Sequence, residues 1–340
     1  MTAIIDGEYV YAWHKEGKKD SQGGTELMTQ KLAEVVDKEL LEKFWIVSSR
    51  MPGPTYNMPE DKIRIFWAHD LAGDPANTFL SDKKAADKFH KFVFVSNWQM
   101  QAYITRYNLP WDKCTVLLNA IDPIEVGDKP DTKDEIRLIY HPTPRRGLNI
   151  LAVVFDALCE KYDNLRLDVY SSHALYGWEE SDEEYKGVFD ILDANPKVNN
   201  HGTVDQATMR KALSEAHIFA YPSTWAETSC RCLMEAMSAQ TLCVHSNYGA
   251  MYETAANWTQ MYQYTTDQNA HASMLYGILA GCIENIDAML PRAQSAKTYA
   301  DVFYTWNSRE REWNALLESL VNTIKDTTFP KEIFTIKTGS

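Results

Sequence analysis

Two glutamates with seven residues between them, Glu227 and Glu235, are the side chains whose type and spacing most directly suggest chemistry. Eight positions at about 3.6 residues per turn place both carboxylates on nearly the same side if they share one helix. An apolar run precedes them, and the small polar residues Thr228 and Ser229 follow the first glutamate. The free backbone N–H groups at such a helix start can hold a phosphate. The stretch therefore predicts an anion-binding helix with two carboxylates, although a solvated helix face would show the same pair.

Two further positions suggest contact with a ligand. Gly23 and Gly24 stand directly before an amphipathic stretch that extends to about residue 40. A glycine pair lets the backbone approach a ligand closely, but it also occurs in plain strand-to-helix connections. His69 follows an apolar run of strand length, at the position where open α/β sheets place ligand-contacting residues. A lone histidine at a strand end is more often structural, so this residue needs support from its surroundings.

Apolar runs of strand length alternate with amphipathic stretches along most of the chain, which indicates parallel, doubly wound sheets. Residues 123–134 change to Pro, Gly, Asp and Lys and are the candidate linker. We therefore expect an α/β protein with two Rossmann-like domains facing a cleft, at residues 1–130 and 131–300. In residues 301–340 a helical pattern carries Trp306 and Trp313 on one face. This tail could return to the first domain or pack on the second.

Composition restricts the class of protein. The 340 residues are 45% hydrophobic, enough for a core in each domain, and the net charge of −13 argues against a broad nucleic-acid surface. No run approaches the roughly 18 to 20 apolar residues of a membrane span, and the first residues lack the order of a signal peptide. We expect a cytoplasmic protein. Its six cysteines lack the paired spacings of a zinc site, so reduced and buried thiols are expected.

Three segments together resemble family 4 of the retaining glycosyltransferases, within the glycosyl transferases group 1. They are residues 96–122, residues 137–148 with the sequence RLIYHPTPRRGL, and residues 201–255, which are the most specific. The resemblance extends over most of the chain from about residue 23 to residue 255. It implies the GT-B arrangement, in which two Rossmann-like domains face a cleft and the second holds most of the donor sugar nucleotide.

The resemblance also implies roles for residues around the two glutamates. Glu235 would accept hydrogen bonds from the ribose hydroxyls of the donor, a task that suits a carboxylate. Glu227 would lie beside the transferred sugar. The backbone N–H groups of Thr228, Ser229 and Cys230 would meet sugar hydroxyls and the diphosphate.

Other matching positions lie outside this stretch. Arg146 matches a basic residue that neutralises the diphosphate leaving group, where negative charge grows in the transition state; the adjacent Arg145 is the alternative. His69 matches a histidine near the reacting centre of the donor sugar. Gly23 and Gly24 match a glycine loop near the phosphates and the acceptor.

Three positions are less informative. Asn119 matches the asparagine of an Asn-Gly-Ile-Asp turn that here reads Asn-Ala-Ile-Asp, which makes a positive φ at Ala120 less easy. Gln240 stands where glycine is usual. Glu253 matches a glutamate on a loop and is a weaker cleft candidate.

The resemblance implies a retaining hexosyl- or pentosyltransferase that uses a nucleoside diphosphate sugar, with a UDP-sugar favoured, and no cofactor. The sequence contains no Asp-x-Asp, so we expect no metal, with Arg146 and the helix start neutralising the diphosphate. In the family the acceptor attacks on the leaving-group face and the donor phosphate helps to remove its proton. The alternatives are a sugar-nucleotide epimerase of the same architecture and a non-catalytic sugar-nucleotide or glycan-binding protein. The acceptor stays open among glycans, lipids, proteins and small molecules, and the acidic charge disfavours a nucleic-acid base.

Overall fold

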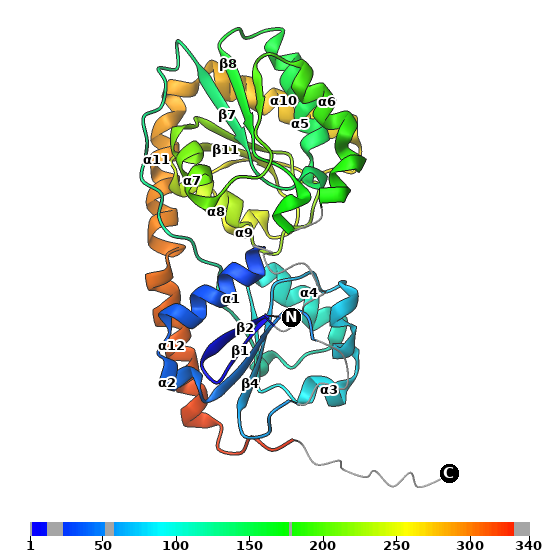
Figure 1. The fold of residues 1–340 in the computed structure, drawn as a ribbon, viewed down its shortest axis with the longest axis vertical. Coiled ribbons are helices and arrows are strands. Elements are labelled where there is room, and N and C mark those ends of the chain that lie inside the picture. The colour runs from blue at the N-terminus through cyan, green and yellow to red at the C-terminus, as the bar shows by residue number, and fades with distance from the viewer. Residues whose placement is uncertain (1, 12–22, 52–57, 177–178, 330–340) are drawn as a thin grey trace, which may run out of the picture.

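The computed structural model describes residues 2–11, 23–51, 58–176 and 179–329. Two α/β halves, each built around a six-stranded sheet, lie one above the other along the long axis of the molecule (Figure 1). We call β1–β6 with α1–α4 and α12 the N-terminal half, and β7–β12 with α5–α11 the C-terminal half. The expected fold class, two Rossmann-like α/β units, is confirmed.

The sheet of the N-terminal half has the order β2-β1-β3-β4-β5-β6. Its strands are β1 (Thr2–Ile5), β2 (Glu8–Tyr11), β3 (Phe44–Ser48), β4 (Ile63–Ala68), β5 (Lys91–Phe94) and β6 (Cys114–Val116). The strands β3 to β6 are parallel, but β1 is antiparallel to both β2 and β3. The expectation of parallel pairing throughout is wrong here. Asp6 and Gly7, both at positive φ, split the first apolar run into a tight hairpin.

The sheet of the C-terminal half is parallel throughout, with the order β12-β11-β10-β7-β8-β9. Its strands are β7 (Ile136–Tyr140), β8 (Leu165–Val169), β9 (Val198–Asn200), β10 (Ile218–Tyr221), β11 (Leu242–Ser246) and β12 (Gln260–Tyr262). The chain begins in the middle at β7, builds outward to β9, and returns to the other side of β7 with β10. The loops that leave β7 and β10 therefore diverge at the strand-order reversal, where open α/β sheets bind ligands.

Helices cover both sheets. They are α1 (Gly24–Val35), α2 (Lys38–Leu41), α3 (Lys83–Asp87), α4 (Asn97–Tyr107), α5 (Leu148–Cys159), α6 (Lys186–Ala194), α7 (Gln206–Glu215), α8 (Arg231–Ser238), α9 (Met251–Ala255), α10 (Gln268–Glu284), α11 (Ile286–Phe303) and α12 (Trp306–Thr323). The acidic stretch that precedes α6 forms a 3-10 helix, η5 (Glu179–Tyr185). In the described parts of the chain, no helix has the length and apolarity needed to cross a membrane. All six cysteines are free thiols.

The chain crosses between the halves twice, and the crossings run together. Ile121 in the outgoing segment forms a backbone bridge with Thr305, and its N–H donates to the Tyr304 carbonyl at 2.7 Å. Beyond this point α12 packs on the N-terminal half, where Trp313 meets the ring of Trp67 edge-on at 4.9 Å. Figure 1 shows α11 along the C-terminal half and α12 beside α1 and α2. The helix α12 thus lies on the N-terminal core, one of the two arrangements that the pattern of the tail allowed, and residues 330–340 of the tail lie outside the described residues.

Candidate functional site

An ion pair marks the point where the strand order of the C-terminal sheet reverses. Arg146 ends a 3-10 turn after β7, and Glu227 lies in the loop after β10. Nη1 of Arg146 donates to Oε1 of Glu227 at 2.5 Å, and the Tyr221 hydroxyl donates to the same oxygen at 2.5 Å. Glu227 is only 5% exposed. A buried carboxylate is stable when it is paired in this way, so the pair fixes the Arg146 guanidinium at the end of the sheet.

Two glycines bring the backbone of these loops together. Gly147, directly after Arg146, has φ +106°, and a Cβ there would come within 2.0 Å of the Pro222 carbonyl oxygen. Gly249 has φ +71°, and a Cβ there would come within 2.5 Å of the Glu227 carbonyl oxygen. Larger residues would be both strained and too close at these positions. The sequence thus holds the Arg146 turn and the Glu227 loop in a close contact that only glycine permits.

Glu227 and Glu235 do not share a helix, so that part of the prediction is wrong. The helix α8 begins at Arg231, four residues after Glu227, and Cys230 is its N-cap. Glu227 is extended instead because its backbone forms a bridge with Gly249 and its carbonyl accepts the Ala250 N–H at 2.7 Å. Glu235 lies on the second turn of α8, as expected.

The predicted backbone donors near Glu227 are partly used within the protein. The Cys230 N–H points to Oγ1 of Thr254 at 3.5 Å. Thr228 contributes its side chain, which donates to the His69 carbonyl at 2.7 Å. The buried Ser229 hydroxyl has no hydrogen-bond partner within the described residues. Thr228 thus connects the two halves, and Ser229 keeps a polar atom that a ligand could engage.

The structure separates the two adjacent arginines that the sequence left as alternatives. The exposed Arg145 places its guanidinium over the Trp225 ring, with 4.5 Å from Cζ to the ring centroid. Arg146 points inward to Glu227, and its side chain is 19% exposed. Only Arg146 therefore extends from the turn toward the carboxylates.

The start of α8 faces the start of α1 across the two halves. Nη2 of Arg231 donates to Oε1 of Glu235 at 3.0 Å. Cδ of Arg231 lies 4.0 Å from the point where a Cβ on Gly24 would be. Gly23, the N-cap of α1, provides no side-chain cap. The glycine pair and Glu235 are thereby brought to one region of the interface, with Arg231 between them.

His69 approaches the same region from the end of β4. Its N–H donates to the Ser49 hydroxyl at 2.8 Å, and its ring Nε2 is buried without a hydrogen-bond partner in the described parts of the chain. Burial, together with the nearby Arg231 charge, lowers the pKa of His69 to about 3. The imidazole is therefore neutral at physiological pH and can exchange a hydrogen bond with a hydroxyl, but it cannot serve there as a cation.

The minor candidates have structural positions. The Glu253 carboxylate accepts the backbone N–H groups of Asn97 at 2.8 Å and of Trp98, so it caps α4 of the opposite half and is not free in the cleft. Asn119 is 6% exposed and its Oδ1 has no partner among the described residues. Ala120 avoids positive φ, while Gln240 adopts φ +58° at the turn where glycine is usual.

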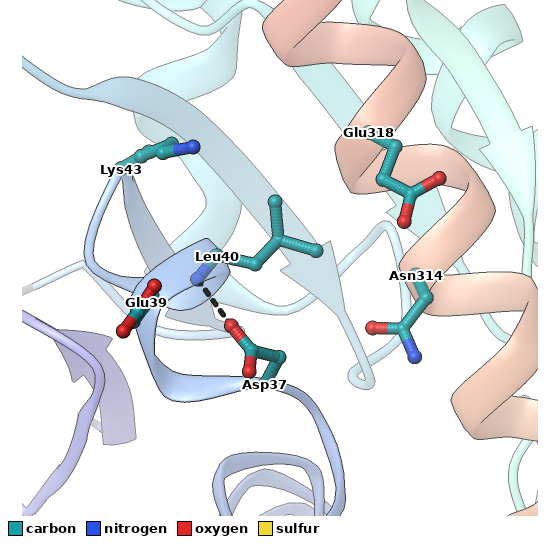
Figure 2. Close-up of a pocket in the computed structure, with 6 residues that line it drawn as sticks. All are labelled: Asp37, Glu39, Leu40, Lys43, Asn314 and Glu318. Atoms are coloured by element: carbon teal, nitrogen blue, oxygen red, sulfur yellow. Dashed lines mark hydrogen bonds between the residues drawn. The ribbon is translucent and has the colours of Figure 1, made fainter.

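Two pockets lie away from the ion pair. The one in Figure 2 lies between α2 and α12 and has a volume of about 360 Å³. Asp37 at its edge caps the N–H of Leu40 at 2.8 Å, so this carboxylate serves the helix end. A second pocket of about 240 Å³, beside β7, β8 and β9, is lined by Arg137 and by acidic partners that already pair with it. Neither lining includes Arg146 or Glu227.

Sequence reasoning missed Tyr221 and Arg231 as neighbours of the site. From the sequence, Tyr221 is only the end of a strand, because a tyrosine six residues before a glutamate gives no periodic signal. Arg231 falls in a helix-forming run, and the available signal is that it is the one arginine between the two glutamates. No three His, Cys, Asp or Glu residues cluster as metal ligands in the described ranges.

Comparison with known proteins agrees with this fold. Residues 124–278 match the family model described as glycosyl transferases group 1. A solved glycosyltransferase from Rickettsia africae shares the fold, with a TM-score of 0.67 and 15% identity over 93% of this chain and 85% of that chain. Anabaena HepE, solved in complex with UDP-glucose, has a TM-score of 0.63 and 16% identity over 88% of this chain and 85% of that one.

A curated human protein is also similar, a subunit of the phosphatidylinositol N-acetylglucosaminyltransferase. It is 23% identical over 260 residues, which are 72% of this chain and 50% of that protein. The chain thus spans about half the length of the curated relative that it matches. The fold is the one that these solved glycosyltransferases share, with two α/β units of the GT-B architecture. Residues 124–278 thus match the glycosyl transferases group 1, the group that the sequence resemblance indicated.

Proposed function

We propose that this protein is a retaining glycosyltransferase of family 4 that transfers a hexose or pentose from a UDP-sugar to an acceptor hydroxyl without a metal ion. The observation that carries the proposal is the pairing of Arg146 with Glu227 where the loops after β7 and β10 diverge. This is the ligand-binding edge of an open α/β sheet, and it holds a fixed cation and a fixed carboxylate.

Similar proteins support the choice of donor. HepE was solved with UDP-glucose and, in another structure, with UDP, and the human relative is named for transfer of N-acetylglucosamine. A nucleotide sugar on this chain would place its diphosphate between Arg146 and the start of α8. Its ribose would lie on Glu235, and the transferred sugar would lie beside Glu227 and the neutral ring of His69.

The proposed reaction is the one that the family resemblance implies, with these residues in its roles. The acceptor oxygen forms a bond to the anomeric carbon while the bond from that carbon to the diphosphate oxygen breaks, and its electron pair stays on the diphosphate. The acceptor proton passes to a phosphate oxygen on the same face of the sugar. Arg146 stabilises the charge that grows on the leaving group, and Glu227 stabilises positive charge on the sugar. The aligned N–H groups at the start of α8 contribute further positive potential.

Metal independence rests on the charges that the chain itself supplies. The sequence lacks an Asp-x-Asp, the pair of carboxylates that would clamp a metal on the diphosphate. In this proposal Arg146, a cation held by its buried partner Glu227, takes the role of that metal. We therefore expect turnover to persist in EDTA.

The test is incubation of the protein with UDP-glucose and UDP-N-acetylglucosamine, with EDTA, with and without a mixture of acceptors. Release of UDP by the wild type and its loss in Glu227→Gln support the transferase. An isomerised UDP-sugar without release of UDP would favour an epimerase. Binding without any turnover across UDP-, GDP- and ADP-sugars would favour a non-catalytic binding protein. NMR of the product, or of the released sugar, reports whether the anomeric configuration is retained.

A further inference from the structure

Arg231 carries a charge that its helix does not need. It is the first residue of α8, where the backbone dipole already contributes positive charge and where acidic side chains are favoured. Its partner Glu235 follows it by four residues, and this order of charges is the weaker one for an ion pair on a helix. Helix stability therefore does not account for an arginine at this position.

The side chain of Arg231 lies between two helix starts that belong to different halves. Its Cδ is 4.0 Å from the point where a Cβ on Gly24 would lie, in the first turn of the twelve-residue helix α1. The N-cap of that helix, Gly23, is extended and supplies no side-chain acceptor for the first N–H groups of the helix. A guanidinium and the positive ends of two helices thus converge on one place.

The polar atoms of this place are not all satisfied within the protein. The buried Nε of Arg231 has no hydrogen-bond partner among the residues that the structure describes, and neither has the buried Nε2 of His69. The Arg231 charge, after burial, also helps to lower the pKa of His69. The first-turn carboxyl of α1, Glu26, is half-buried, and burial raises its pKa. The region therefore holds two buried nitrogens without a partner, beside an arginine whose charge is paired with Glu235.

We propose that Arg231 binds a phosphate oxygen between the two halves, as a second cation beside Arg146. This inference rests on the proposed function. The diphosphate of the donor is the favoured source of that oxygen, because Arg231 extends from the same helix as Glu235. An acceptor that bears a phosphate is the other source. Nε is available for this contact, since Nη2 makes the hydrogen bond to Glu235.

The Arg231–Glu235 pair then has a defined purpose in the ligand-free protein. It keeps the guanidinium and the carboxylate, which are 21% and 13% exposed, from facing the cleft unpaired. On nucleotide binding the pair divides: Glu235 accepts hydrogen bonds from the ribose hydroxyls, and Arg231 turns to the phosphate. Both groups exchange one charged or polar partner for another, so neither is left buried alone.

The test measures how much each phosphate adds to affinity. Calorimetric dissociation constants are determined for UDP, UMP and uridine on the wild type, Arg231→Ala and Arg231→Gln, with the corresponding GDP or ADP series if that base binds instead. The Arg311→Ala variant, an exposed arginine on α12, is the matched control. We expect Arg231→Ala to weaken UDP about 10- to 100-fold, the size of one charge-assisted hydrogen bond, and to change uridine little. Arg231→Gln should behave likewise, and the control like the wild type.

A loss for uridine as large as that for UDP would mean that Arg231 acts only by orienting Glu235, and it would overturn the proposal. A second series titrates inorganic phosphate into each protein saturated with UDP. If Arg231→Ala loses phosphate binding in this series but keeps its affinity for UDP, the proposal is supported, and the phosphate that Arg231 binds belongs to the acceptor. If Arg231→Ala changes neither the nucleotide series nor the phosphate series, the role of Arg231 is overturned and the proposed function still stands. If no nucleoside diphosphate binds the wild type, the proposed function fails and this inference fails with it.

Discussion

Replacement of Arg146 by alanine should separate the proposed catalysis from stability in this protein. The substitution leaves the Glu227 carboxylate, 5% exposed, with the Tyr221 hydroxyl as the partner that remains at Oε1. Removing one partner of a buried ion pair costs about 3–5 kcal/mol, and the 19% exposure of the Arg146 side chain favours the lower end. Loss of one group that stabilises transition-state charge lowers kcat by about 10²- to 10³-fold. KM for the donor should change less than kcat.

The adjacent residue provides the control. Arg145→Ala removes an equal charge from the same turn, but that guanidinium lies over the Trp225 ring and is exposed. A cation–π contact of this kind contributes about 0.5–1 kcal/mol, so both activity and unfolding midpoint should stay near the wild type. Denaturant unfolding and initial rates with UDP-glucose measure the two effects.

A double variant tells the two effects of Arg146 apart. In Arg146→Ala combined with Glu227→Gln, the unpaired buried charge is gone, so we expect part of the lost stability to return while activity stays low. Equal activity of Arg145→Ala and Arg146→Ala, or a double variant that regains turnover, would refute the assignment of Arg146.

Three further outcomes are expected. Glu235→Ala should raise the donor KM at least about 10-fold with a smaller change in kcat, and an unchanged KM would count against a ribose contact. Gly249→Ala should destabilise the protein by more than about 1 kcal/mol, because its Cβ would lie within 2.5 Å of the Glu227 carbonyl oxygen; Gly187→Ala, with nothing within 4 Å, should not. Lowering the pH from 7 to 5 should reduce the free energy of unfolding, because burial lowers the pKa of His245 to about 4 and of His69 to about 3. The unfolded chain, with histidine pKa values near about 6.5, then binds more protons than the native one. A free energy of unfolding that is flat over this range in denaturant titrations would contradict the last expectation.

The sequence predicted the strands well where the spacing of the apolar residues and the local composition both indicate a buried strand. The strands β7, β8, β10 and β11 of the C-terminal sheet fall in the apolar runs, because buried parallel strands are nearly continuous in apolar residues. The short edge strand β9, Val198–Asn200, is largely polar and exposed. Sequence reasoning failed at the first strand pair, since a two-residue turn inside a short apolar run gives little signal beyond Gly7. It also failed to predict β12 and α10, which follow the last segment carrying a resemblance.

The candidate site, like the fold, could be predicted from the sequence only in part. Glu227, Glu235 and Arg146 were identified from the sequence, and the structure brings Glu227 and Arg146 into direct contact. The helix position of Glu227 was wrong because a backbone bridge to Gly249, a contact between distant segments, overrides local helix propensity. The Arg231–Glu235 pair and the Glu253 cap on α4 likewise depend on geometry that no local pattern carries.

A crystal structure with the most stabilising nucleoside diphosphate tests the central claim most directly. Candidates can be ranked by thermal shift, since a specific ligand raises stability by mass action. We predict the diphosphate between Arg146 and the start of α8, with the ribose hydroxyls on the Glu235 carboxylate. A nucleotide bound elsewhere, for instance in the pocket between α2 and α12 in Figure 2, with the Arg146–Glu227 and Arg231–Glu235 regions unoccupied, would contradict the account.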